Sequence, residues 1–204
     1  MKTLPEILSK YSPDDETRAL LLSAEDVVVK ADKEARALQI IARFPRLIPK
    51  ETLYRIEGEV EAAYELNYVK FLPKYPSALY SDAYIPELLR ETERVGIVAR
   101  GFFSTWRHHV EGDVLVIEIP FIREGVMLLV DAHTPEIMQR ILKSEFDIDV
   151  RIEIRNSEDM QGDFEARYQK RMDDMDARLA EASREYERSL AARQESAAPP
   201  KAAP

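Results

Sequence analysis

Few residues of this chain have the types and spacing that catalysis or metal binding requires. His108 and His109 are adjacent. Adjacent side chains point apart in a strand and lie about 100° apart on a helix, so one metal ion would not readily bind both. We interpret them as a solvated pair at a helix end, and we expect His133, near a predicted helix junction, to be structural or exposed. Asp147 and Asp149 share one face of a predicted strand and could hold Mg²⁺, but no further ligands accompany them, so exposed alternation is expected.

Aromatic and basic side chains cluster along a long helix predicted for residues 88–106. Phe102, Phe103 and Trp106 could stack against nucleic-acid bases, but aromatic residues at helical spacing usually belong to a core, and we expect burial. The same segment carries four arginines, Arg90, Arg94, Arg100 and Arg107. Glutamates are interleaved with these arginines, so we interpret them as a solvated face.

The composition excludes several kinds of chemistry. The chain of 204 residues contains no cysteine, which rules out disulfides, thiolate catalysis and cysteine-based zinc sites. Its 6 glycines form no phosphate-binding loop and no nucleophile elbow. The formal net charge of −9 disfavours non-specific nucleic-acid binding. We therefore expect no catalytic residue, cofactor or metal in this chain.

No segment of the sequence suggests a membrane or a secreted location. The N-terminus lacks the apolar region of a signal peptide, and no run approaches the roughly 20 apolar residues that span a bilayer. We expect a cytoplasmic protein that does not bind membranes.

Residues 1–75 have the pattern of a ββαβ subdomain with a leading helix. Ser12 is expected to cap that short helix. Three strands are predicted, over residues 26–30, 37–44 and 67–72. A polar hairpin turn at residues 32–34 joins the first two, and Pro49 opens an amphipathic helix before the third.

Residues 80–156 are predicted to form a second, KH-like subdomain. Its elements follow the order αβααβ: a helix over 88–106, a strand over 114–119, a helix over 123–130, a helix from Thr134 and a strand over 147–155. Thr134 is expected to cap its helix. KH domains clamp nucleic acid with a Gly-x-x-Gly loop between their two helices, whereas this chain has Asp131-Ala132-His133-Thr134 there. The topology is therefore expected to be KH-like without the binding chemistry.

The last part of the chain has a different composition. Residues 157–196 are predicted to form a long charged helix whose apolar residues, such as Met160, Phe164 and Met172, form one stripe. Residues 197–204 have the composition of an Ala/Pro linker. No internal repeat is evident in the sequence. The predicted fold class is α+β, with two small subdomains followed by the charged helix.

Several segments together carry a resemblance to a known family. They are the strand DVVVK, the run ALQIIARFPRLIPKETLYRIEGEV, the helix ending at Trp106, EGDVLVIEIP, the helical pair and IDVRIEIRN. In this order they resemble the N-terminal region of PolC-type DNA polymerase III alpha subunits, over roughly residues 12–196. The part from EGDVLVIEIP to IDVRIEIRN is also similar in pattern to the C-terminal, polymerase-binding domain of the clamp-loader tau subunit.

The resemblance implies that this chain is the front of a larger protein. In that family the region precedes an OB-fold, a phosphoesterase-like domain with an inserted exonuclease, and the polymerase core, so DNA would be bound and copied by the missing remainder. For these residues the resemblance implies docking to the tau subunit, through interface residues that the sequence does not identify.

Two other functions stay open. One is a KH-like module that binds single-stranded nucleic acid, and the other is an adaptor that dimerises through residues 160–190. An enzyme in its own right is the least favoured interpretation.

Overall fold

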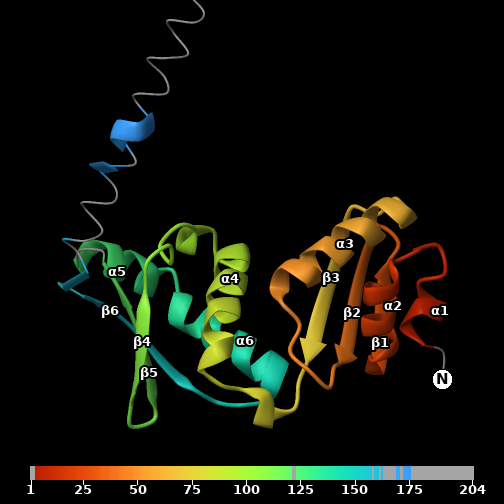
Figure 1. The fold of residues 1–204 in the computed structure, drawn as a ribbon, viewed down its shortest axis with the longest axis horizontal. Helices are drawn as coiled ribbons and strands as arrows, with labels where there is room; N and C mark the ends of the chain where they lie inside the picture. The colour runs from red at the N-terminus through yellow and green to blue at the C-terminus, as the bar shows by residue number, and fades with distance from the viewer. Residues whose placement is uncertain are drawn as a thin grey trace, which may run out of the picture. The chain divides into compact units, whose positions relative to one another are not determined.

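The computed structural model describes residues 3–120, 123–157, 159–160, 162, 169–170 and 172–175. The chain divides into two units, residues 1–156 and residues 157–204. The first unit is an α+β structure with two three-stranded sheets, which confirms the α+β part of the predicted fold class (Figure 1). The charged helix and linker predicted for residues 157–204 lie largely outside the described residues.

The first sheet is built from the N-terminal half of this unit. The elements are α1 (Leu4–Ile7), α2 (Asp15–Leu22), β1 (Glu25–Asp32), β2 (Ala37–Arg43), α3 (Lys50–Tyr64) and β3 (Tyr68–Lys74). β1 and β2 are antiparallel, and β3 joins the other side of β2 in parallel after the α3 crossover. α3 buries Leu53, Ile56 and Val60. The predicted ββαβ order is confirmed.

Local polar contacts fix the start of α2 and the first hairpin. The predicted cap Ser12 is wrong by two residues: the Asp14 carboxylate accepts a hydrogen bond from the Thr17 N–H at 2.7 Å and forms the cap. In the hairpin turn, Asp32 Oδ1 accepts from the N–H groups of Glu34 and Ala35 at 3.0 and 2.9 Å. The polar turn at residues 32–34 is therefore confirmed.

The second sheet is built from the C-terminal half of the unit. Its elements are η1 (Ser77–Leu79), η2 (Asp82–Tyr84), α4 (Ile85–Val95), η3 (Ile97–Ala99), β4 (Arg107–Glu111), β5 (Val114–Ile119), α5 (Arg123–Asp131), α6 (Thr134–Phe146) and β6 (Arg151–Asn156). β4 and β5 are antiparallel, and β6 pairs with β5 in parallel. The order is thus αββααβ, with one more strand than the predicted αβααβ.

The helix predicted over residues 88–106 is confirmed as far as Val95, where α4 ends, and its continuation to residue 106 is wrong. Gly96 is extended, with φ −100° and ψ 99°. It passes so close to the preceding turn that a Cβ would lie 3.0 Å from the Thr92 carbonyl oxygen and 3.5 Å from Ile137 on α6. The chain then turns through η3 and forms β4, so His108 and His109 lie in a strand and not at a helix end.

Two further boundaries differ from the prediction. Thr134 is the first residue of α6 and is buried, while the cap position belongs to His133, which has a left-handed φ of 56°. The last strand begins at Arg151, because Asp147 also adopts a left-handed φ of 56° and ends α6. Asp147 and Asp149 therefore precede the strand and do not share a strand face.

The two sheets have the same topology. Each consists of an antiparallel hairpin followed by a helical crossover to a third strand, which pairs in parallel with the second strand of the hairpin. The sequence shows no repeat, so this similarity is visible only in the strand pairing.

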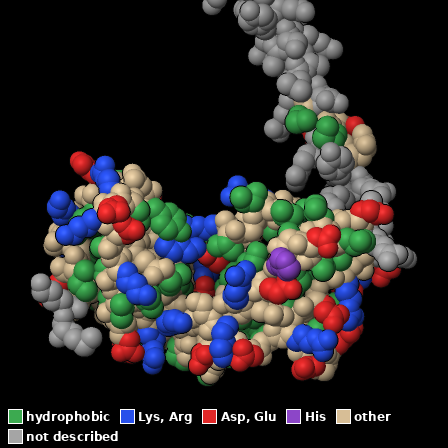
Figure 2. All heavy atoms as spheres, turned by 180° about the vertical axis from the view of Figure 1, so that it is seen from behind, with side chains coloured by type: hydrophobic (Ala, Val, Ile, Leu, Met, Phe, Trp, Pro, Cys, Tyr) green, Lys and Arg blue, Asp and Glu red, His purple; other side chains and the backbone are tan. Residues whose placement is uncertain are grey.

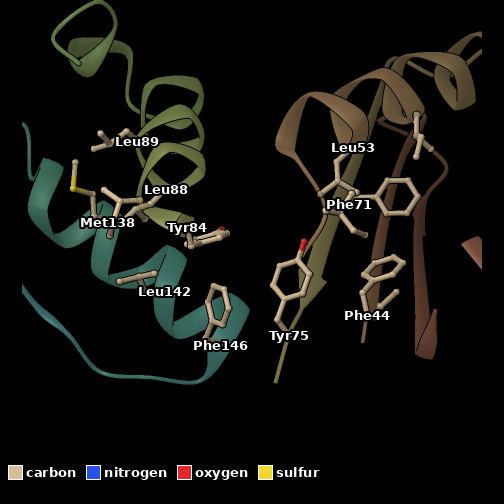
Figure 3. Packing of buried hydrophobic residues seen from close by; sticks show 14 of the residues in the cluster. Phe44, Leu53, Phe71, Tyr75, Tyr84, Leu88, Leu89, Met138, Leu142 and Phe146 are labelled. Carbon is tan, nitrogen blue, oxygen red and sulfur yellow. The ribbon is translucent and has the colours of Figure 1, made fainter. Parts of the chain in front are cut away.

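One hydrophobic core extends through both halves. At the boundary, the Phe146 ring lies 5.3 Å from the Tyr75 ring, which follows β3, and 4.7 Å from the Tyr84 ring (Figure 3). These aromatic contacts pack the end of α6 against the first sheet, so the halves share their interior.

Candidate protein-binding surface

Helix α5 is apolar around most of its circumference but is only partly buried. Its central sequence is Gly125-Val126-Met127-Leu128-Leu129-Val130. Leu129 is fully buried, whereas 52% of Met127, 50% of Leu128 and 47% of Val130 are exposed. A helix that is hydrophobic on all sides is normally buried. The outer side of α5 therefore has the composition of an interface without a partner among the described residues.

The neighbouring 3₁₀ turn extends this surface. η3 packs beside α5, and it exposes 78% of Ile97 and 39% of Val98. We call the five residues Ile97, Val98, Met127, Leu128 and Val130 the α5 patch. Figure 2 shows hydrophobic side chains interspersed with charged ones on one face of the molecule. Contiguous exposed apolar residues of this kind mark binding surfaces more often than isolated ones do.

Acidic side chains lie at both ends of α5. Glu124 stands in its first turn and Asp131 is its last residue, and both are exposed. An apolar centre with a charged border is the usual anatomy of a protein interface. The border favours a partner whose rim is basic.

The strongest buried electrostatic cluster lies elsewhere, between the two halves. Lys50 Nζ forms an ion pair with Glu145, and the Tyr84 hydroxyl donates to the same carboxylate. Burial raises the pKa of Glu145, although the attraction of Lys50 acts in the opposite direction. Glu87 of α4 also accepts from the Lys50 backbone N–H at 2.7 Å and so caps α3. These contacts join the two halves. The charged groups of Lys50 and Glu145 and the hydroxyl of Tyr84 bond to one another within the cluster.

A second buried cluster connects α3 and α4. Arg94 pairs with Glu57 and lies 4.0 Å above the Tyr54 ring. Burial raises the pKa of Glu57. Burial also acts to raise the pKa of Glu91, but hydrogen bonds from Lys70 and the Tyr54 hydroxyl outweigh it, so that pKa is lowered. The prediction that the α4 arginines form only a solvated face is therefore wrong for Arg94.

The remaining arginines make local contacts. Arg90 pairs with the exposed Glu51 at 2.8 Å, and Arg100 Nε donates to the Glu93 carbonyl oxygen at 3.4 Å. Arg107 lies in β4 and pairs with a glutamate of the neighbouring strand. The four arginines consequently form no common site.

The histidines point to separate acidic partners. His108 Nε2 lies 3.6 Å from Asp82 Oδ2, and His109 Nε2 lies 2.9 Å from Glu111 Oε1. His133 is largely exposed at the turn between α5 and α6, as expected. Among the residues that the structure describes, no group of three or more His, Cys, Asp or Glu side chains could hold a metal ion.

The paired aspartates and the aromatic residues have structural roles. Asp147 and Asp149 both pair with Lys143, at 3.1 and 2.8 Å. Phe103 is buried, and Phe102 and Trp106 are partly buried against the core, which confirms the expectation that they are core residues. The structure brings Asp147 and Asp149 together on Lys143, and the Trp106 ring lies 5.7 Å from the His108 ring, but neither pair forms a catalytic or metal site. The α5 patch is the feature that the sequence did not predict. The run of apolar residues 126–130 was its one visible signal.

No protein-family model matches this chain, and a search of curated proteins gives no match. No described helix has the length and apolar character needed to cross a membrane.

Proposed function

We propose that this chain is the docking module of a replicative DNA polymerase III alpha subunit of the PolC type, and that it binds the clamp-loader tau subunit. The α5 patch is the observation that carries the docking role. The partner comes from the sequence resemblance. In this proposal, DNA synthesis belongs to the rest of the polymerase, and the chain works in the cytoplasm.

The shape and chemistry of the α5 patch suit a protein partner. Met127 and Leu128 project from consecutive positions of one helix, and a methionine adapts its side chain to an irregular surface. Ile97, the most exposed of the five, extends the apolar area onto η3. Burying half-exposed aliphatic side chains supplies binding free energy in proportion to the apolar area removed from water. A partner helix or loop with apolar residues and a basic rim would complement this surface.

The topology also supports the resemblance. α5 and α6 follow one another between the parallel strands β5 and β6, as expected for the KH-like part of the proposed family. β4 adds a strand to that arrangement. The turn between the two helices contains His133 in a left-handed conformation and no glycine. This loop lacks the backbone access that a phosphate clamp of the KH type requires.

Calorimetric titration with the C-terminal region of a cognate tau subunit tests the proposal. The full chain should bind saturably, and Leu128→Ser should weaken binding by about tenfold, as expected for a central interface residue. Val110→Ser is the matched control, since Val110 is 61% exposed but lies on β4. Failure of the wild-type chain to bind, or equal effects of the two substitutions, would contradict the proposal. Unchanged circular dichroism would show that both variants fold.

A second candidate function is binding of single-stranded nucleic acid by the first sheet. Val69 and Phe71 are buried beneath α3, so Tyr68 and Lys70 lie on the opposite face of β3. There they line an open trough together with Lys30. Lys70 is already paired with Glu91, so Tyr68 and Lys30 are the aromatic ring and the cation that this trough offers to a base and a phosphate. Oligonucleotide binding that weakens steeply with salt, without tau binding, would favour this function.

The third interpretation, a dimer formed through residues 160–190, concerns a segment that lies mostly outside the described residues. Sedimentation of the full chain and of a chain ending at residue 156 would test it. A dimer that becomes a monomer on truncation would favour the adaptor.

A further inference from the structure

The two edges of the first sheet differ. On the outer edge of β3, the Val69 N–H donates to the Glu61 carboxylate at 2.8 Å, and the Phe71 N–H donates to the Glu57 carboxylate at 2.6 Å. The next outward position on this strand is Pro73, which has no N–H. Side chains of α3 therefore occupy the donors of this edge, and no further strand can pair there.

The outer edge of β1 is open. β1 is the end strand of its sheet, and within the described part of the chain no other backbone segment pairs with its outer side. A bulge between Glu25 and Val28, with Asp26 at a left-handed φ of 48°, distorts the start of the strand. Residues 28–32 then run in continuous register with β2. Alternate residues of this stretch direct their N–H and C=O groups away from β2, which makes a template for another strand.

An apolar pocket lies beside this open edge, on the side covered by helices. Its volume is about 320 Å³. The apolar residues that line it include Val29 and Ala31 of β1, Leu38 of β2, Ile7 of α1, and Tyr64 and Leu66 at the end of α3. Side chains directly opposite one another on paired strands lie about 4.5–5.5 Å apart. A strand added to β1 would therefore place one side chain next to Val29 and Ala31, in the pocket.

Lys30 favours acidic side chains beside this edge. It is exposed and projects to the opposite face of the sheet, where it lines the trough. Lys70 lines the same trough but is paired with Glu91. Lys33 and Arg36 line the apolar pocket, and Arg36 donates to the Glu65 carbonyl oxygen. Among the described residues, Asp32 is the acidic residue that lines both the trough and the pocket. Its Oδ1 already accepts hydrogen bonds from the backbone N–H groups of Glu34 and Ala35. An extended segment with acidic side chains directed toward Lys30 would meet complementary charge.

We propose that residues 28–32 of β1 bind an extended peptide segment of another protein as an additional strand. Its large apolar side chain fills the pocket between β1, α1 and the end of α3, and its alternate, acidic side chains face Lys30. Backbone pairing supplies affinity, and the two faces supply specificity. This site lies in the half of the unit that does not carry the α5 patch, so it is independent of the proposed docking to tau.

Amide hydrogen exchange of the full chain, followed by NMR, tests this site. The probe is the capped peptide Glu-Ile-Glu-Leu-Glu-Ile-Glu, in which the apolar side chains share one face of a strand. We expect alternate amides within residues 28–32 to become protected in its presence. The control peptide has the same sequence with alternate backbone nitrogens methylated on the edge that would face β1. It should bind at least about tenfold more weakly, because it loses two or more backbone hydrogen bonds.

Substitutions in the chain test the contribution of each face of the site to peptide binding. Ile7→Asp places a charge in the pocket wall, and Lys30→Glu reverses the charge on the other face, so both should weaken peptide binding. Arg151→Glu, at an exposed position of β6, is the matched charge-reversal control and should bind as the wild type does. Absence of protection in β1 at millimolar peptide, or equal binding of the methylated peptide, would overturn the proposal.

Discussion

Replacing Lys50 with methionine is expected to destabilise the molecule strongly. Lys50 and Glu145 expose only 2% and 7% of their side chains, so the substitution would leave a carboxylate buried beside the Tyr84 hydroxyl without its cation. Removing one partner of a buried ion pair typically costs about 3–5 kcal/mol. Because a domain of ordinary stability has only about 5–15 kcal/mol in total, Lys50→Met should remove a large fraction of it.

Urea denaturation of a double-mutant cycle measures this effect. Glu145→Gln keeps an acceptor for Tyr84 without a charge, so the double variant should be more stable than the sum of the single effects predicts. The pH dependence gives a second signature. Burial raises the pKa of Glu145 in the folded state, and loss of the Lys50 cation should raise it further. At pH values between the ordinary glutamate pKa and the raised pKa of Glu145, the native state binds more protons than the unfolded state. The Lys50→Met variant should therefore regain stability as the pH falls through this range.

A cost below about 1 kcal/mol for Lys50→Met, or strictly additive effects in the cycle, would show that Lys50 and Glu145 are not a coupled, desolvated ion pair. A cost that does not change with pH would show that the pKa of Glu145 is not raised in the folded variant. Met127→Ser on the exposed face of α5 is the matched control for stability, and it should change the free energy of unfolding little.

Other substitutions test individual contacts. Burial raises the pKa of Glu57, so its contribution to the free energy of unfolding falls as the pH rises above the ordinary glutamate pKa. Glu57→Gln should remove this pH dependence, and the curve of stability against pH should become flatter in that range. The backbone and side-chain hydrogen bonds from Thr17 lower the pKa of Asp14, so Asp14→Ala should lower the melting temperature at neutral pH and lose its effect as the pH falls through the native pKa of Asp14. Phe146→Ala removes a ring that packs against two tyrosines and should lower the free energy of unfolding by about 3–5 kcal/mol in chemical denaturation.

The N-terminal half could be predicted because its signals are local and agree with one another. β2 has buried Ile40 and Ala42 at alternate positions, α3 has apolar residues at helical spacing, and Asp32 supplies the turn. The error at Ser12 has a simple origin. Both Ser12 and Asp14 can cap a helix, and the choice depends on which one reaches a free N–H in the folded chain.

The segment between residues 96 and 111 could not be predicted from periodicity. Val95, Ala99 and Phe103 continue the helical spacing of α4, yet Gly96 leaves the helix where the chain approaches α6. β4 is short, with the sequence RHHVE, and has no alternation of apolar residues. Its pairing with β5 creates the strand, so the strand depends on tertiary context and not on its own propensity.

The candidate site was only partly visible in the sequence. Residues 126–130 are a short apolar run, which fits a buried helix as well as an exposed one. Only the fold shows that Leu129 is buried while its neighbours remain half exposed. The ion pair of Lys50 with Glu145 likewise joins residues far apart in the chain, and no spacing rule connects them.

The most direct test of the docking role is hydrogen exchange of the full chain with and without the C-terminal region of tau. If tau binds the α5 patch, amides of η3 and of residues 127–130 in α5 should gain protection in the complex, while those of residues 28–32 in β1 should not. Protection confined to another surface, or no change at saturating tau, would contradict the claim that the α5 patch is the docking surface.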